Sequence, residues 1–356
     1  MSVRGKLITA VAVALGFLAA CGPAATPIPA RPAVVPTVSP TVALSPVTAG
    51  SQSSVPISLD SAEDVELLRT FEGHSDPVVA VAFSGDAVHI ASASLDRTIR
   101  LWDVASGREV HTFSIREVGL HTLAFSPDGR LLASSEAIWD VESKQVVHAL
   151  HQGNYPVAFS PDGTILAVAQ PAQSIQLWDV ASGQVVRTLD NQIIEVFHDI
   201  QFSPDGTRLA AGGHRYDGTV LYGVVVLWDE ENGQIPRTFE QDTANSIHGV
   251  AFSPDGRLLA SAGTEGTTKL WDVTNGQVVL TMQGNGCYDV AFSPDGSLLA
   301  TAGCDRTVML WDVASGRQVG SLPHGDEVMA VTFSSDGTLL LSGGHDNQVY
   351  LWGVPR

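Results

Sequence analysis

The tryptophans constrain this chain most, because each of the seven in its 356 residues closes the same short pattern. Each follows leucine or isoleucine, and six precede aspartate while the last precedes glycine. They are Trp102, Trp139, Trp178, Trp228, Trp271, Trp311 and Trp352. Their spacings are 37, 39, 50, 43, 40 and 41 residues. A period near 40 residues indicates a repeat architecture, in which each copy stacks on its neighbours to bury its apolar faces.

A second marker lies ahead of each tryptophan. It reads FSPDG at Phe125, Phe159, Phe202, Phe252 and Phe292, with the variants FSGDA at Phe83 and FSSDG at Phe333. In the sixth copy, Pro294 presets φ for a type I turn, Asp295 accepts from the turn backbone and Gly296 tolerates left-handed φ. A second turn, Ala314-Ser315-Gly316, follows the tryptophan. Each copy therefore predicts a four-stranded antiparallel meander, and radial stacking would remove most exposed strand edges.

Repeats with both markers at this period resemble the WD40 family, over residues 65–356. The resemblance implies an all-β fold, a seven-bladed β-propeller. The last repeat ends one strand short, and the segment at 65–71 (VELLRTF) resembles the fourth-strand segments GQVVRTL and GQIPRTF. We therefore expect the N-terminal and C-terminal strands to pair in one blade and close the ring.

The N-terminus reads as an export signal. Arg4 and Lys6 precede fourteen apolar residues at 7–20, too few to span a bilayer. The following Leu18-Ala19-Ala20-Cys21 resembles a bacterial lipobox, which implies cleavage before Cys21 and attachment of acyl chains, palmitate among them, as a membrane anchor. The alternative is an ordinary signal peptide with a cysteine near its end.

Three regions follow from these features: a lipoprotein signal peptide at 1–20, a Pro/Thr/Ala-rich disordered tether at 21–62 and the propeller at 63–356. The predicted location is outside the cytoplasm, at the cell surface or on the periplasmic side. The net charge is −19, and it becomes −21 when Arg4 and Lys6 leave with the signal. Such acidity argues against a nucleic-acid partner.

The WD40 resemblance also implies buried chains of histidine, serine or threonine, aspartate and tryptophan. Two repeats match in full: His74, Ser92, Asp96 and Trp102 in the first, and His324, Ser342, Asp346 and Trp352 in the last. A Ser-His-Asp set also invites a catalytic interpretation. We favour a structural role, since no oxyanion site or substrate cleft is evident, and we expect neither catalysis nor a cofactor or metal.

Repeat four is the longest, with 22 residues from Gly206 to Trp228. The extra residues predict a projecting loop at 214–222, in a connection that lies on the partner-binding top face of WD40 proteins. Arginine and tyrosine are enriched at interface hot spots. The candidate partner contacts are His214, Arg215, Tyr216, Tyr222, Arg97 and Arg306. The alternative is a solvated insertion.

Cys287 and Cys304 are the other two cysteines. Counting back from the SPDG turn places Phe292 near Leu299 and Cys287 near Cys304. In an exported protein this predicts a disulfide, with two reduced thiols as the alternative.

The leading functional hypothesis is a lipid-anchored, non-catalytic scaffold that offers its top face to a protein or peptide. The alternatives are an enzyme or sensor with a small molecule or metal at the central axis, and an envelope-assembly factor. An axial site would need polar residues converging from several blades, and no such repeated position is evident near the first strands. A tether that enters at the fourth strand should approach from the bottom face, turning that face to the membrane. The sequence does not specify the partner, the membrane or the oligomeric state.

Overall fold

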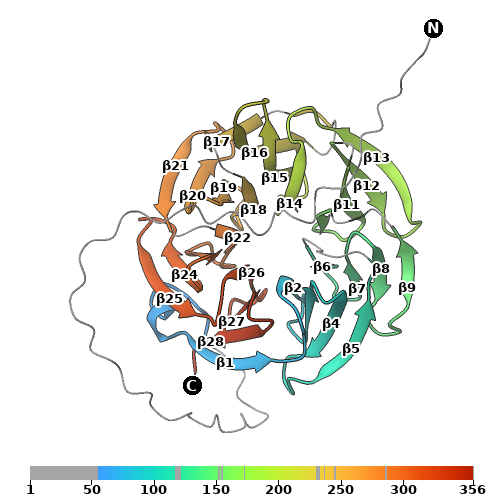
Figure 1. Cartoon of the computed structure of the whole chain (residues 1–356), viewed down its shortest axis with the longest axis vertical. Helices are drawn as coiled ribbons and strands as arrows, with labels where there is room; N and C mark the ends of the chain where they lie inside the picture. The colour runs from blue at the N-terminus through green and yellow to red at the C-terminus, as the bar shows by residue number, and fades with distance from the viewer. Residues whose placement is uncertain are drawn as a thin grey trace. The chain divides into compact units, whose positions relative to one another are not determined.

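The computed structural model describes residues 55–355, except 117–121, 151–152, 154, 172, 230–232, 236, 244–245 and 285–286. The described residues form seven four-stranded antiparallel sheets arranged as blades around a central axis (Figure 1). The predicted seven-bladed propeller is confirmed. Residues 1–54, which include the predicted signal peptide, Cys21 and most of the tether, lie outside the described residues.

In blades one to six the strands follow chain order from the axis to the rim. Blades one to three contain β2 (Val78–Phe83), β3 (His89–Ser94), β4 (Thr98–Asp103), β5 (Glu109–Ser114); β6 (Ala124–Phe125), β7 (Leu131–Ala133), β8 (Ala137–Asp140), β9 (Val146–Ala149); β10 (Val157–Phe159), β11 (Ile165–Gln170), β12 (Ser174–Asp179) and β13 (Gln184–Asp190). Blades four to six contain β14 (Val196–Phe202), β15 (Arg208–Tyr216), β16 (Leu221–Asp229), β17 (Arg237–Thr243); β18 (Ile247–Phe252), β19 (Leu258–Gly263), β20 (Thr267–Asp272), β21 (Val278–Gln283); β22 (Cys287–Phe292), β23 (Leu298–Gly303), β24 (Thr307–Asp312) and β25 (Gln318–Pro323).

The seventh blade joins the two ends of the propeller. Its inner strands are β26 (Val328–Phe333), β27 (Leu339–Gly344) and β28 (Val349–Gly353), and its outer strand is β1 (Glu66–Phe71). β1 pairs antiparallel with β28, with Phe71 opposite Val349 and Leu67 opposite Trp352. Figure 1 shows β1 at the rim beside β28. The predicted closure is therefore confirmed, and the ring is held by strand pairing between residues that are distant in the sequence.

Packing begins before the predicted tether boundary at residue 62. Ile57 is 1% exposed and belongs to one apolar cluster with Leu310 and Leu322 of blade six. Its N–H donates to the carbonyl of Gly337, in the first turn of blade seven, at 2.8 Å. The 3₁₀ turn η2 (Ala62–Asp64) then leads into β1. An apolar residue of the proline-rich segment thus packs between two blades ahead of residue 63.

The SPDG turns form as their residue chemistry predicts. In blade six, Asp295 accepts the N–H of Ser297 at 3.0 Å and the hydroxyl of Ser293 at 2.6 Å. The same hydroxyl oxygen accepts the N–H of Leu298 at 2.9 Å. Gly296 has a φ of 71°, in the left-handed region that favours glycine. These bonds satisfy the turn backbone and fix the register of the hairpin.

Tryptophans connect successive blades. The Phe71 ring of β1 lies 5.6 Å from Trp102 in blade one, and Phe113 of blade one lies 5.4 Å from Trp139 in blade two. Phe239 of blade four repeats this contact with Trp271 in blade five, also at 5.4 Å. A fourth-strand phenylalanine thus packs against the next tryptophan, which buries the blade faces that an isolated meander would expose.

The first hairpin of blade six differs from the predicted register by one residue. Phe292 lies opposite Leu299 as expected, but a bulge after Cys287 places that residue opposite Gly303 instead of Cys304. The Cys287 side chain lies outside what the structure describes, so the disulfide stays a prediction. The count from the turn missed the bulge because it assumed one-to-one pairing.

Blades two and four depart from the common size, and the extra length of blade four was predicted. In blade two, β6 and β7 have only two and three residues. In blade four, β15 and β16 have nine residues each.

No helix in the described part of the chain is long and apolar enough to cross a membrane.

Candidate functional site

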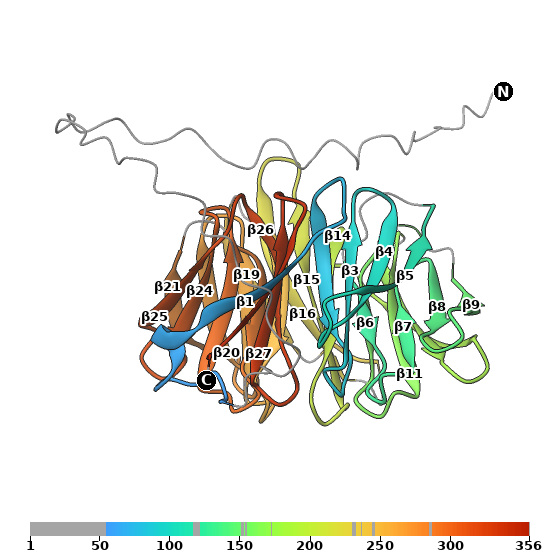
Figure 2. The ribbon, with the colours of Figure 1, turned by 90° about the horizontal axis from the view of Figure 1, so that it is seen from below.

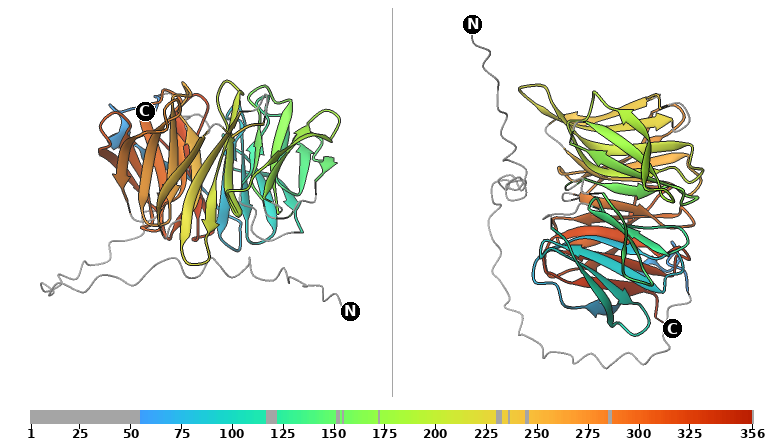
Figure 3. Two further views of the ribbon diagram at one scale, coloured as in Figure 1. Left: turned by 90° about the horizontal axis from the view of Figure 1, so that it is seen from above. Right: turned by 90° about the vertical axis from the view of Figure 1, so that its right-hand side faces the viewer.

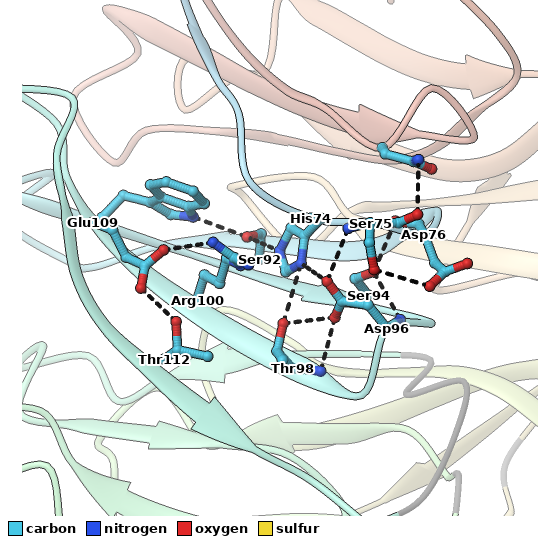
Figure 4. Close-up of polar contacts among 12 residues, drawn as sticks. His74, Ser75, Asp76, Ser92, Ser94, Asp96, Thr98, Arg100, Glu109 and Thr112 are labelled. Atoms are coloured by element: carbon cyan, nitrogen blue, oxygen red, sulfur yellow. Dashed lines mark hydrogen bonds and ion pairs between the residues drawn. The ribbon is translucent and has the colours of Figure 1, made fainter.

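The chain of polar residues predicted in repeat one is assembled in blade one (Figure 4). The His74 ring lies between Asp96 and Ser92, with Nδ1 2.8 Å from Asp96 Oδ2 and Nε2 2.8 Å from Ser92 Oγ. The indole N–H of Trp102 donates to Ser92 Oγ at 2.9 Å. Asp96 also accepts the hydroxyl of Thr98 at 2.6 Å. The network therefore ties the loop before β2 to β3 and β4.

This geometry does not support nucleophilic catalysis at Ser92. The residue is 0% exposed, so no substrate can reach its hydroxyl. The hydroxyl is already engaged by the histidine and the indole. Burial lowers the pKa of His74 in spite of the neighbouring Asp96 carboxylate, which keeps the ring neutral near pH 7. A satisfied buried network of this kind rigidifies the fold.

In blade seven, three of the four residues predicted to form the polar network are joined by hydrogen bonds. His324 Nε2 lies 2.7 Å from Ser342 Oγ, which accepts the Trp352 indole N–H at 2.8 Å. Asp346 does not contact His324; it accepts the Tyr350 hydroxyl at 3.0 Å and the Gly325 N–H at 2.9 Å. The predicted bond between His324 and Asp346 does not form, since His324 Nδ1 instead lies 3.2 Å from the Leu322 carbonyl oxygen.

Two further blades also contain the last bond of the network. The indole N–H groups of Trp271 and Trp311 donate at 2.9 Å to Ser261 and Thr301, each ten residues earlier. In blade three the corresponding residue is Val168, and among the described residues the indole nitrogen of Trp178 finds no acceptor. A serine or threonine ten residues before a tryptophan therefore predicts that the indole N–H of that tryptophan donates to a hydroxyl oxygen.

The long hairpin of blade four projects from the ring, as Figures 2 and 3 show. The strands extend to Tyr216 and resume at Leu221, so the turn is shorter than the predicted loop. Tyr216 is 52% exposed, and its hydroxyl donates to the Gly218 carbonyl at 2.9 Å. Asp217 accepts two turn N–H groups and the Thr219 hydroxyl, which lowers the pKa of its carboxyl.

Arg215 is held on this hairpin from two sides. Its Nη2 donates to Glu240 Oε1 at 2.9 Å, and its guanidinium carbon lies 4.6 Å from the centre of the Tyr222 ring. An ion pair combined with a cation–π contact restricts the rotamers of a long side chain. The Arg215–Tyr222 pair therefore offers a preordered surface next to the exposed Tyr216.

His214 does not lie on the exposed part of the hairpin. Its Nδ1 is 3.1 Å from His198 Nε2 and 3.1 Å from Ser246 Oγ, and burial lowers the pKa of its ring. The His214 ring is half-buried and contacts β14 and the segment before β18 rather than the exposed tip of the hairpin, and its partner contact stays a prediction. Arg97 and Arg306 are exposed in the second-to-third strand turns, each with a φ of 66°.

A cavity of about 580 Å³ follows the propeller axis. Its walls come from the first strands of the blades, and three of its residues are His198, His248 and Tyr288. These three occupy equivalent positions, four residues before the phenylalanine of the FSPDG marker and at the bulge of each first strand. No repeated polar position was expected there, but counting backward from the FSPDG marker places all three residues at the same offset.

The three side chains form a continuous row at the cavity. The rings of His198 and His248 are stacked, with centroids 4.2 Å apart and planes 14° apart. The Tyr288 ring lies edge-on to His248 at 5.8 Å, and its hydroxyl donates to Glu327 Oε2 at 3.2 Å. Glu327 in turn lies 3.8 Å from His345 Nδ1. Burial and these neighbours raise the pKa of Tyr288, so its phenol stays protonated.

Next to this row, two half-buried aspartates join blades. Asp199 accepts the N–H of Val250 in the next blade, and Asp289 accepts the N–H of Val331 in the next, both at 2.9 Å. Burial raises the pKa of Asp199 well above its ordinary value and that of Asp289 to about 7. Gly249 lies between them, where a Cβ would come within 2.8 Å of the Asp289 Cα. These residues serve packing and inter-blade bonding.

The described residues contain no group of three or more histidine, cysteine or acidic side chains placed to hold a metal ion. At the cavity, the axial row presents the rings of His198 and His248 and the ring and hydroxyl of Tyr288. This row meets the blade-four hairpin where His198 contacts His214.

A ring of seven sheets, each with its SPDG-type turn and its tryptophan, defines a β-propeller built from repeated Trp–Asp units. The family model described as "WD domain, G-beta repeat" matches more than half of the chain, at residues 65–103, 183–222, 233–272, 276–312 and 316–353. The chain therefore belongs to the WD40 repeat family. The matched segments leave out residues 104–182, which include the shortened blade two.

Individual relatives match over shorter stretches. The chain is 30% identical over 155 residues to the WD repeat-containing protein SL1-17 of Schistosoma mansoni, covering 41% of this chain and 51% of that protein. It is 39% identical over 89 residues to the small ribosomal subunit protein RACK1 of Medicago sativa, covering 24% and 27%. A match to mitochondrial division protein 1 of Saccharomyces cerevisiae is 29% identical over 126 residues, covering 35% and 16%. The chain thus spans about half or less of the curated relatives it matches.

Proposed function

We propose that this protein is a lipid-anchored, non-catalytic interaction scaffold, displayed outside the cytoplasm, whose top face binds a protein or peptide. Membership of the WD40 family supports a role in protein interaction. The hydroxyl of Ser92 is buried and already hydrogen-bonded to His74 and Trp102. This favours a structural role for the residues that resemble a catalytic triad. The lipobox-like Leu18-Ala19-Ala20-Cys21 supports the anchor.

The observation that carries the partner site is the surface of the blade-four hairpin. Tyr216 is the one aromatic residue among the large apolar side chains found exposed in the described part of the chain. Arg215 and Tyr222, beside it, are preordered by the Glu240 ion pair and by their mutual contact. Preordered aromatic and arginine side chains lose little entropy on binding, which suits an interface hot spot. We place the partner against this hairpin.

Site-specific photo-crosslinking tests this assignment. With p-benzoylphenylalanine in place of Tyr216, irradiation of intact cells should give one discrete crosslinked species. The matched control is Arg257, an exposed residue in the SPDG turn of the adjacent blade and at the opposite end of its hairpin. It should give little or none of that species. Equal crosslinking from both positions, or crosslinking from position 257 alone, would remove the hairpin as the partner site.

The anchor has a separate test. In cell fractionation, Cys21→Ser should move the protein from the membrane fraction to the soluble fraction, because the acylated residue is gone. Cys304→Ser is the matched control and should leave the protein with the membrane. Retention of the Cys21→Ser protein in the membrane would contradict the lipid anchor while leaving the partner site untouched.

We further propose that the bottom face, which carries the SPDG turns, is turned toward the membrane. The described chain approaches from the side of these turns, since the N–H of Ile57 bonds to Gly337 in the turn of blade seven. An anchor upstream of Ile57 would then direct the blade-four hairpin outward, where a partner can reach it.

A further inference from the structure

We propose that a groove between blades two and three binds an extended, basic segment of a partner protein and takes up one aliphatic side chain of that segment. The two blades are neighbours in the ring (Figure 1), and the groove has a volume of about 520 Å³. Leu131 and Val147 of blade two and Val180 of blade three line it, together with residues of both SPDG turns. Leu131 is half-buried and Val147 is 43% exposed, so part of this apolar lining faces solvent.

The chain itself fills the equivalent place between blades six and seven. There the side chain of Ile57 is 1% exposed and belongs to one apolar cluster with Leu298 and Val354, against which Val319 packs. The N–H of Ile57 donates to the Gly337 carbonyl at 2.8 Å, in the first turn of blade seven. One aliphatic side chain and one backbone N–H thus hold a segment of irregular structure in this seam.

The two seams correspond residue by residue. Counted from the SPDG turn and the tryptophan of each repeat, the residues of the filled seam are Leu298, Val319, Gly337 and Val354, and those of the groove are Leu131, Val147, Gly163 and Val180. The strand pairing agrees, since Leu131 lies opposite Asp140 as Leu298 lies opposite Asp312. Leu298 is 0% exposed in the filled seam, whereas Leu131 is half-buried. An aliphatic side chain in the groove would therefore bury apolar surface that is now exposed.

Four aspartates that line the groove favour a basic ligand. Among the described lining residues their one basic neighbour is Arg130, which is 75% exposed and lies 3.8 Å from Asp140. Hydrogen bonds from serines of their own turns lower the pKa of all four carboxyl groups, which are those of Asp128, Asp140, Asp162 and Asp179. The groove is therefore negatively charged at neutral pH and attracts lysine or arginine.

The same charge argues against a second copy of this chain as the ligand. Residues 55–68, which include Ile57, contain four acidic residues and no lysine or arginine. This segment of a second copy would bring like charges together in the groove. We therefore assign the groove to a segment of another protein, in which an aliphatic residue has lysine or arginine close on both sides. Its backbone N–H would donate to the Gly163 carbonyl, as that of Ile57 does to Gly337.

The groove is separate from the blade-four hairpin. Its lining residues Pro127, Asp128, Asp162 and Gly163 belong to SPDG turns, which lie at the opposite end of the blades from the hairpin tip. The partner proposed for the hairpin and a basic segment in the groove can therefore bind at the same time. In the proposed orientation of the SPDG face toward the membrane, the basic segment would belong to a protein close to that membrane.

Fluorescence anisotropy of a labelled peptide, titrated with the purified full chain, tests the proposal. The probe KKVPISLKK repeats the sequence around Ile57 between lysines. It should bind saturably. KKVPDSLKK, which lacks the aliphatic anchor, and EEVPISLEE, which reverses the flanking charge, should each bind about tenfold more weakly.

Two variants locate the bound peptide. Val147→Lys replaces an exposed valine of the groove by a positive charge and should weaken the binding of KKVPISLKK by about tenfold. Ala181→Lys does the same from blade three and serves if Val147→Lys folds poorly. The matched control is Val279→Lys, since Val279 holds the position of Val147 in blade five and is 52% exposed. The control should bind the peptide as the wild type does.

Absence of saturable binding of KKVPISLKK to the wild-type chain would overturn the proposal. So would equal weakening by Val147→Lys and Val279→Lys, or equal affinity for KKVPISLKK and EEVPISLEE. In sedimentation velocity, a wild-type dimer that Val147→Lys dissociates would assign the groove to a second copy and would overturn it too. The Tyr216 crosslink reports on a different face of the propeller, so either test can fail without the other.

Discussion

Replacing Phe71 by alanine is expected to lower the free energy of unfolding by about 3–5 kcal/mol, the range for deleting a fully buried phenylalanine. Phe71 is 2% exposed and lies in one apolar cluster with Ile90 of blade one and Val349 of blade seven. Its ring also contacts Trp102. The residue thus fills the seam where β1 closes the ring. Urea unfolding followed by tryptophan fluorescence measures the change.

The matched control is Leu67→Ala on the same strand, since Leu67 is 37% exposed. It should cost less than about 1 kcal/mol. If neither variant lost stability relative to the wild type, the Phe71 side chain would not contribute to closure. If both lost the same large amount, the exposed Leu67 would contribute as much as Phe71, and filling of the seam by Phe71 would not explain the loss.

The second large effect is expected for Ser92→Ala. The substitution removes one hydroxyl but leaves two buried groups without it, the Trp102 indole N–H and His74 Nε2. Each buried group left unsatisfied costs about 1–3 kcal/mol, so for the two groups we expect a loss of about 2–6 kcal/mol. Thermal or urea unfolding, with tryptophan emission as the signal, measures it.

Thr301→Val provides the comparison for that variant. Thr301 accepts the Trp311 indole N–H in blade six, where no aligned histidine is present. The near-isosteric change leaves one group unsatisfied and should cost about 1–3 kcal/mol. A loss for Ser92→Ala no larger than that for Thr301→Val would mean that the histidine bond adds nothing to stability.

Much of this protein follows from local sequence. The tryptophan and SPDG markers specify seven meanders, since their turn residues and alternating apolar residues act over a few positions. The closure of the ring could also be predicted from the sequence, because the segment at 65–71 carries the fourth-strand pattern that the last repeat lacks. The projecting hairpin was visible as extra length between Gly206 and Trp228.

The tertiary structure decided which side chains of different repeats contact one another. The bulge at His198, His248 and Tyr288 turns equivalent residues of three blades into one row at the axis, and a bulge leaves no mark in the residue types. In the same structure, the His214 ring contacts His198, and Asp346 accepts the Tyr350 hydroxyl. The sequence alone determined the repeated unit, because turn chemistry and strand pattern are local. The convergence of side chains from different blades depends on register and packing, which only the closed ring fixes.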